Sequence, residues 1–189
     1  MLSANVLVIV GGAAMIVVIV MGRARGTSGP TIVARCALLG ALCWILALTI
    51  FPIPVETQWW RFHRFFTNMH FLPFGTIRAQ LAYGLEYSEA RQLIGNVVLF
   101  VPLGFLLPAA LRSLRRVWPT LLVAAALSVL IETTQAILPE HATDVDDVIL
   151  NTAGAALGFF AFSLIAWMVR QRTAPEAETL EEPAPSSAG

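Results

Sequence analysis

The sequence contains no lysine, and charged residues account for only 13% of its 189 residues. A soluble domain usually devotes about a quarter of its residues to charge. Because hydrophobic residues reach 57% and the net charge is zero, the composition indicates a membrane protein and argues against a nucleic-acid partner. Only two cysteines are present, Cys36 and Cys43. They share one apolar stretch, and their spacing on a helix is too long for a disulfide bond.

Five apolar stretches are each long enough to cross the hydrocarbon core, which takes about 20 residues. They run from Leu2 to Met21, Ile32 to Ile53, Leu93 to Leu111, Trp118 to Leu138 and Val148 to Val169. The sequence therefore predicts an all-α, polytopic helical membrane protein with five transmembrane helices. The first stretch has no basic residue before it and no small-residue cleavage site, so we expect a retained anchor rather than a signal peptide.

The charges of the loops predict an orientation. Arg112, Arg115 and Arg116 lie between the third and fourth spans without an acidic residue, whereas the loop after the fourth span is acidic. Because basic loops stay in the cytoplasm, we expect the N-terminus outside and the C-terminus in the cytoplasm. The segment from Pro54 to Arg91 carries four arginines and must nevertheless be outside, where its length weakens the rule.

That long segment also predicts an interfacial amphipathic helix. Its apolar residues recur at helical spacing: Trp59, Phe62, Phe66 and Met69. Arg61 and Arg64 fall on another face, as in a helix that lies among lipid headgroups. The segment serves either as an interfacial anchor, which we favour, or as a lid over an anionic lipid head.

Glu132 is the only acidic residue inside any of the five predicted spans. Because a charged carboxylate at the bilayer centre costs about 3 kcal/mol, we expect Glu132 to be protonated, paired or in contact with a wet cavity. Gln135 follows on the same helical face. With Asn96 at the start of the third span and Asn151 at the start of the fifth, these residues are predicted to converge at one depth on the outer side. Hydrogen bonds that hold the helices together, at about 0.6 kcal/mol each, could alone produce this convergence. We favour a functional site, because ionisable residues inside a membrane are functional candidates by default.

An acidic run precedes the fifth span. One helical face of that span begins with the last acidic residue of the run and includes two glycines. Asp147 and Asn151 are four residues apart and share that face, and Gly154 and Gly158 allow another helix to pack closely. The acidic residues have capping-box spacing in two pairs: Asp144 with Asp147, and Thr143 with Asp146. The run lacks the glycine pattern of a calcium loop, so we predict no metal site, and we predict no cofactor.

Several of these residues lie in motifs that resemble the VanZ-like family of bacterial membrane proteins. The motifs are Pro73-Phe74, GNVVLFVPLGFLLP from Gly95 to Pro108, Ile131-Glu132 with Gln135, and DVDDVILNTAGAALG from Asp144 to Gly158. The resemblance covers roughly residues 68 to 165. Family members commonly place an arginine just before the acidic run, where this chain has His141. That departure puts in doubt any role that needs a fixed positive charge there.

The resemblance, together with the apolar stretches and the composition of the tail, predicts a division of the chain, and the resemblance implies a set of binding residues. Residues 1–30 form an extra N-terminal transmembrane helix with a short cytoplasmic loop, 31–172 the VanZ-like transmembrane domain, and 173–189 a disordered acidic tail. The family pattern falls on Asn96, Glu132, Gln135, Asp147 and Asn151.

The family is named for a protein linked to low-level resistance to the glycopeptide teicoplanin, which implies a role at the cell envelope. We therefore expect binding of a lipid headgroup, a lipid-linked wall precursor or a glycopeptide at the outer leaflet. The alternative is a membrane enzyme that acts on such a lipid with Glu132 as general acid or base. The sequence lacks the Ser/His/Asp order of hydrolases, a nucleotide-binding loop and a phosphatase-like His/Arg set, which favours binding. It does not specify an oligomeric state.

Overall fold

The computed structural model describes residues 4–50, 69–70, 72–83, 87–137 and 143–180. The elements are, in chain order, α1 (Ala4–Ala24), α2 (Gly29–Thr49), β1 (Met69–His70), α4 (Gly75–Tyr83), α5 (Tyr87–Ala110), the short 3-10 helix η2 (Arg112–Leu114), α6 (Val117–Ile137), β2 (Thr143–Asp144) and α7 (Val145–Leu180). In this part of the chain five helices are long and apolar enough to cross a membrane: α1, α2, α5, α6 and α7. The predicted all-α, multi-pass membrane fold is confirmed.

The observed spans begin and end within a few residues of the predicted ones. They are Val6–Ala24, Gly29–Thr49, Gln92–Ala110, Val117–Ala136 and Val145–Arg172. The second begins earlier than predicted because Pro30 occupies the first turn of α2, where its missing N–H is not needed. The fifth begins earlier because Asp144 accepts a hydrogen bond from the backbone of the first turn of α7.

Two predictions concern residues at the borders of the described part. The amphipathic helix predicted around Trp59 falls mostly on residues 51–68, which lie outside the described residues. Met69, the last apolar residue assigned to that helix, lies in strand β1 instead, where it pairs with Thr143. Helix α7 continues to Leu180, and residues 181–189 are also outside the described part. The division of the chain into three parts therefore stays a prediction.

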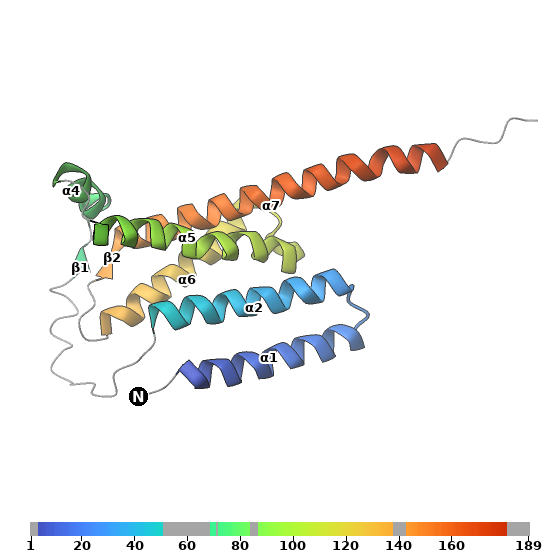
Figure 1. The fold of residues 1–189 in the computed structure, drawn as a ribbon, viewed down its shortest axis with the longest axis horizontal. Helices are drawn as coiled ribbons and strands as arrows, with labels where there is room; N and C mark the ends of the chain where they lie inside the picture. Colours follow the sequence, from blue (N-terminus) through green and yellow to red (C-terminus); the bar gives the residue numbers. More distant parts are fainter. Residues whose placement is uncertain (1–3, 51–68, 71, 84–86, 138–142, 181–189) are drawn as a thin grey trace, which may run out of the picture.

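Successive long helices run in opposite directions, so the bundle has two distinct ends (Figure 1). At one end α5 and α7 begin and α2 and α6 finish; we call it the acidic end, because Glu132, Asp144, Asp146 and Asp147 lie there. At the other end α2 and α6 begin and α5 finishes; we call it the basic end, because Arg35, Arg112 and Arg115 lie there.

Helices α5 and α7 form the centre of the bundle, with backbones in direct contact. A Cβ atom added to Gly154 would lie 2.1 Å from the carbonyl oxygen of Val97, and one added to Gly158 would lie 2.0 Å from that of Val101. Gly104 on α5 is equally close to Ala155 on α7. The predicted packing role of Gly154 and Gly158 is therefore confirmed.

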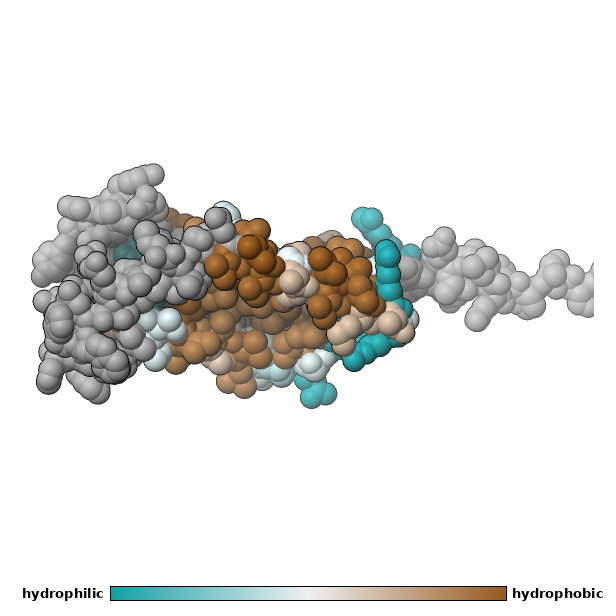
Figure 2. All heavy atoms as spheres, turned by 90° about the horizontal axis from the view of Figure 1, so that it is seen from below, coloured by the Kyte–Doolittle hydropathy of each residue, from teal (hydrophilic) through white to brown (hydrophobic). Residues whose placement is uncertain are grey.

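The remaining helices surround this pair, and apolar side chains cover the outside. Helix α6 packs on α7, α2 packs on α5, and α1 packs on α2. Figure 2 shows apolar residues over the middle of the bundle and hydrophilic residues at the basic end. On α1, Val8 is 73% exposed and Ile9 is 71% exposed. A bundle with an apolar exterior of this kind suits a lipid environment.

Candidate functional site

Glu132 is a buried carboxylate near the end of α6, with 5% of its surface exposed. Its Oε2 accepts a hydrogen bond from the backbone N–H of Asp144, at 3.3 Å. Glu132 and Asp147 are also close enough to interact electrostatically. The side chain thus connects α6 to the beginning of α7 at the acidic end.

Asp144 immediately precedes α7 and caps its first turn, but it does not form the predicted capping box. Its Oδ1 accepts the backbone N–H of Asp146 at 2.9 Å, as an N-cap does. In a capping box the side chain of Asp147 would accept the backbone N–H of Asp144. That N–H is donated to Glu132 instead. The hydroxyl of Thr76 donates to the other carboxylate oxygen of Asp144.

Asp146 is 1% exposed and joins α7 to α4. Its Oδ1 accepts the backbone N–H of Phe74 at 2.5 Å, and its Oδ2 accepts that of Ile77 at 3.0 Å. These donors lie at the start of α4, where the first turn of a helix leaves N–H groups without partners. Phe74 has φ of 62°, a backbone conformation that costs roughly 1–2 kcal/mol outside glycine. Hydrogen bonds to Asp146 offset that cost.

Two short strands strengthen the same connection. Strands β1 and β2 pair in parallel, with Met69 opposite Thr143 and His70 opposite Asp144. Together with the bonds from Asp144 and Asp146, the pairing attaches the chain between residues 69 and 77 to the start of α7. Sequence reasoning placed Asp144 and Asp146 in the acidic run but did not predict this attachment.

Asn96 and Asp147 join α5 to α7 beside this cluster. The Nδ2 of Asn96 donates to the Oδ1 of Asp147 at 2.5 Å. Asp147 has no other hydrogen bond or ion pair with a described residue, so its Oδ2 remains available as an acceptor. The structure thus brings together Asn96 and Asp147, two of the residues on which the family pattern falls.

Asn151 lies one turn deeper in α7 than Asp147 and has an oxygen without a partner. Its side chain is 4% exposed, and its Nδ2 donates to the Oγ of Ser128 on α6 at 2.9 Å. The Oδ1 of Asn151 is buried and has no hydrogen-bond partner among the described residues. The sequence did not single out Ser128 as a site residue, although it precedes Glu132 by one helical turn on the same face.

Gln135 is directed to a different neighbour. Its Nε2 donates to the carbonyl oxygen of Thr49, at 2.8 Å, and so joins α6 to the end of α2. The predicted residues therefore divide into two groups: Asn96, Glu132, Asp147 and Asn151 lie along the contact of α5, α6 and α7, whereas Gln135 contacts α2. His141 lies outside the described residues. Among the residues that the structure describes, no group of three or more His, Cys, Asp or Glu side chains has a metal-binding arrangement.

Comparison with known proteins places the chain in a family. The VanZ/LLP1 family model matches residues 38–166. The chain belongs to the VanZ/LLP1 family. That match includes every residue of the site and leaves α1 outside. The chain is 36% identical to Protein VanZ of Enterococcus faecium over 74 residues, which are 39% of this chain and 45% of that protein. The match thus spans less than half the length of that relative, and no solved structure matches the chain.

Proposed function

We propose that this VanZ/LLP1 protein binds the ammonium group of a lipid headgroup or lipid-linked wall precursor at the outer leaflet of the cell membrane. The observation that carries the proposal is the buried Oδ1 of Asn151, which lacks a donor among the described residues. A buried acceptor without a partner costs about 1–3 kcal/mol, so a donor supplied by a ligand would recover that energy.

The chemistry of the neighbouring groups favours a cationic donor. Asp147 uses one carboxylate oxygen for Asn96 and has the other available, and Glu132 is electrostatically coupled to Asp147. All of these groups accept hydrogen bonds, and two of them carry negative charge when ionised. A primary ammonium group supplies three N–H donors and the opposite charge, whereas a bare phosphate would be repelled.

The depth of the site suits a headgroup rather than a soluble ligand. Glu132 lies four residues before Ala136, where the span of α6 finishes, which is roughly 6 Å along a helix at 1.5 Å per residue. The adjacent Leu130 and Thr133 are exposed on the bundle surface, so lipid molecules reach this part of α6 directly.

We expect the purified full-length protein to distinguish two lipids with the same net charge. Phosphatidylethanolamine carries N–H donors, and phosphatidylcholine carries none. Added to the protein in detergent, phosphatidylethanolamine should raise the melting temperature at concentrations at least about tenfold lower than phosphatidylcholine, because a hydrogen bond to a charged acceptor contributes about 1.5–3 kcal/mol. Asp147→Asn should remove this preference, because it replaces the available carboxylate oxygen by a donor.

A matched control is Thr133→Val. Thr133 is the exposed neighbour of Glu132, and the one hydrogen bond that its hydroxyl makes with a described residue is to the carbonyl of Val129 in its own helix. This variant should keep the preference for phosphatidylethanolamine. Equal stabilisation of the wild type by both lipids would refute the ammonium proposal, and stabilisation by a glycopeptide alone would reassign the ligand.

The assignment to the outer leaflet requires the N-terminus outside, which cysteine accessibility in intact cells tests. After replacement of Cys36 and Cys43, single cysteines at Glu140 and Ser113 are treated with a membrane-impermeant thiol reagent. We expect labelling at position 140 and protection at position 113, because the basic loop stays in the cytoplasm. The reverse result would place the acidic end in the cytoplasm and exclude the outer-leaflet proposal.

The second candidate function is catalysis, with Glu132 as the reacting side chain. Glu132 is a buried carboxylate beside the proposed ligand site, which also suits a general acid or base. Incubation with phosphatidylethanolamine, followed by mass spectrometry of the lipid, separates the two. Under the binding proposal the lipid is recovered unchanged with the wild-type protein. A product that accumulates with the wild type and falls at least about a hundredfold with Glu132→Gln would assign an enzyme.

A further inference from the structure

The basic end of the bundle contains two cavities that share one arginine. The first, of about 570 Å³, lies between the start of α2 and the end of α5. Its basic side chains are Arg35, Arg112 and Arg115. The second, of about 490 Å³, lies against α7 and is lined by Arg115 together with Phe162, Trp167 and Arg170. Arg115 therefore connects a basic cavity with a mainly apolar one.

Two of the three arginines of the first cavity are held in position by backbone carbonyl groups. The Nε of Arg35 donates to the carbonyl oxygen of Ala110 at 3.4 Å, and that of Arg115 to the carbonyl of Pro108 at 3.5 Å. In the part of the chain that the structure describes, the remaining guanidinium N–H groups of Arg35 and Arg115 have no acceptor. Within the described residues no carboxylate forms an ion pair with Arg35, Arg112 or Arg115. Helix α2 begins at the same cavity, and its N-terminus adds partial positive charge.

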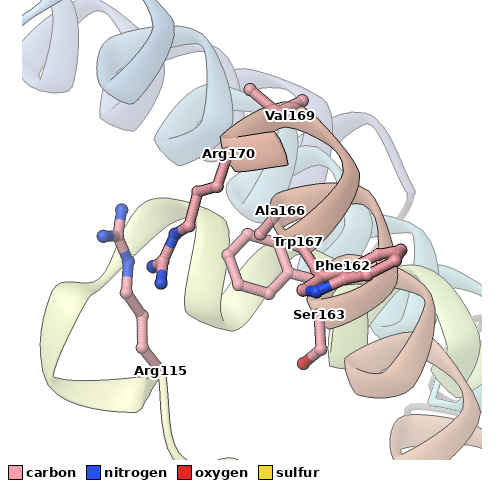
Figure 3. A pocket seen from close by; sticks show the side chains of 7 residues that line it. All are labelled: Arg115, Phe162, Ser163, Ala166, Trp167, Val169 and Arg170. Atoms are coloured by element: carbon pink, nitrogen blue, oxygen red, sulfur yellow. The ribbon is translucent and has the colours of Figure 1, made fainter. Parts of the chain in front are cut away.

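The second cavity supplies a surface for a hydrocarbon chain. Figure 3 shows the guanidinium groups of Arg115 and Arg170 side by side, with the aromatic rings of Phe162 and Trp167 on the same side of α7 as Arg170. Trp167 is 58% exposed, and tryptophan is common where a helix passes from hydrocarbon to headgroups. A molecule that fills both cavities must therefore carry an anionic group next to an apolar chain.

We propose that the basic end binds an anionic phospholipid of the leaflet on that side. Its phosphate is held by Arg35, Arg112 and Arg115, since guanidinium groups match phosphate oxygens in charge and geometry. Its glycerol and acyl chain lie along Phe162 and Trp167. This site is at the opposite end of the bundle from Glu132 and is independent of the ammonium ligand proposed there.

The test compares two neighbouring arginines of equal charge. Arg115 lines both cavities, whereas Arg116 lines neither and is also exposed. The full-length protein is placed in lipid nanodiscs that contain phosphatidylcholine and phosphatidylglycerol. It is then released from the nanodiscs, and native mass spectrometry measures which lipid stays bound. We expect phosphatidylglycerol to be retained preferentially, and Arg115→Gln to weaken its retention about tenfold, as loss of charge-assisted hydrogen bonds does. Arg116→Gln should change retention less than about twofold, because general surface attraction is weak and screened.

Further variants keep the test decisive if Arg115→Gln fails to fold. Arg112 lines the first cavity, and its side chain makes no described hydrogen bond, so Arg112→Gln should fold normally and weaken retention several-fold. Equal losses for Arg115→Gln and Arg116→Gln would show a diffuse basic surface and overturn the proposal. If inorganic phosphate raises the melting temperature of the protein as much as phosphatidylglycerol does, the ligand is a free anion and the lipid assignment is overturned.

Discussion

Replacing Gly158 by alanine should destabilise the protein more than any other single added methyl group in α7. The new Cβ would lie 2.0 Å from the carbonyl oxygen of Val101 and 2.7 Å from the backbone nitrogen of Phe105. Neither atom belongs to a flexible side chain, so α5 and α7 must separate. Overpacking of a well-packed contact typically costs about 1–3 kcal/mol, and a clash with backbone on the central helix pair places Gly158→Ala at or above about 3 kcal/mol. An unfolding titration in detergent, followed by circular dichroism, measures this loss.

Gly95 provides the matched control, because it lies on α5 and no described atom is within 4 Å of an added Cβ. Gly95→Ala should leave the free energy of unfolding unchanged or raise it slightly, since alanine is the better helix former by about 1 kcal/mol. If Gly158→Ala and Gly95→Ala change the free energy of unfolding by the same amount, the close contact between α5 and α7 does not exist as described. Loss of this contact should also disturb the candidate site, because the contact between α5 and α7 places Asn96 beside Asp147.

The fold could be predicted from the sequence because the membrane imposes a strong physical constraint. A spanning segment must satisfy its own backbone hydrogen bonds, which requires a long apolar helix. Five such segments are visible as long runs of apolar residues in the sequence. Alternation of direction then places Asn96, Glu132 and Asn151 at the same end without further information. The glycine spacing in α7 likewise predicted which face packs closely.

The partners of individual polar side chains could not be predicted in the same way. Gln135 shares a helical face with Glu132, yet it bonds to Thr49 of α2, which is 86 residues away in sequence. The N–H of Asp144 goes to Glu132 rather than to Asp147, because the chain reverses between α6 and α7 and returns Asp144 to α6. Spacing along one helix specifies which side chains share a face, but tertiary packing decides which of several acceptors a donor reaches.

Asp146 is the clearest case of a tertiary contact hidden from the sequence, and its removal is the second change with a large expected effect. The carboxylate accepts backbone N–H groups of Phe74 and Ile77, 72 and 69 residues earlier in the chain. Each hydrogen bond to a charged group contributes about 1.5–3 kcal/mol, so Asp146→Ala should lower the free energy of unfolding by about 3 kcal/mol or more. Hydrogen exchange of the full-length protein should show at least about tenfold less protection at these two amides.

Asp147→Ala is the control that separates this contact from a general effect of lost negative charge. Asp147 is the adjacent carboxylate, and its described hydrogen bond is to the side chain of Asn96 rather than to the backbone of α4. We therefore expect Asp147→Ala to leave the amides of Phe74 and Ile77 protected. Loss of protection in both variants would mean that charge in the acidic run, rather than the specific bonds of Asp146, holds the start of α4 in place.

The same experiment tests whether the attachment of α4 supports the proposed ligand site. The bonds of Asp146 and the pairing of β1 with β2 hold the chain against Asp144, whose backbone N–H is donated to Glu132. If this connection positions Glu132, Asp146→Ala should weaken the preference for phosphatidylethanolamine although Asp146 does not contact the ligand. If the preference survives while the amides of α4 lose protection, the segment between residues 69 and 77 is a structural attachment only, and Glu132 is positioned by the packing of α6 alone.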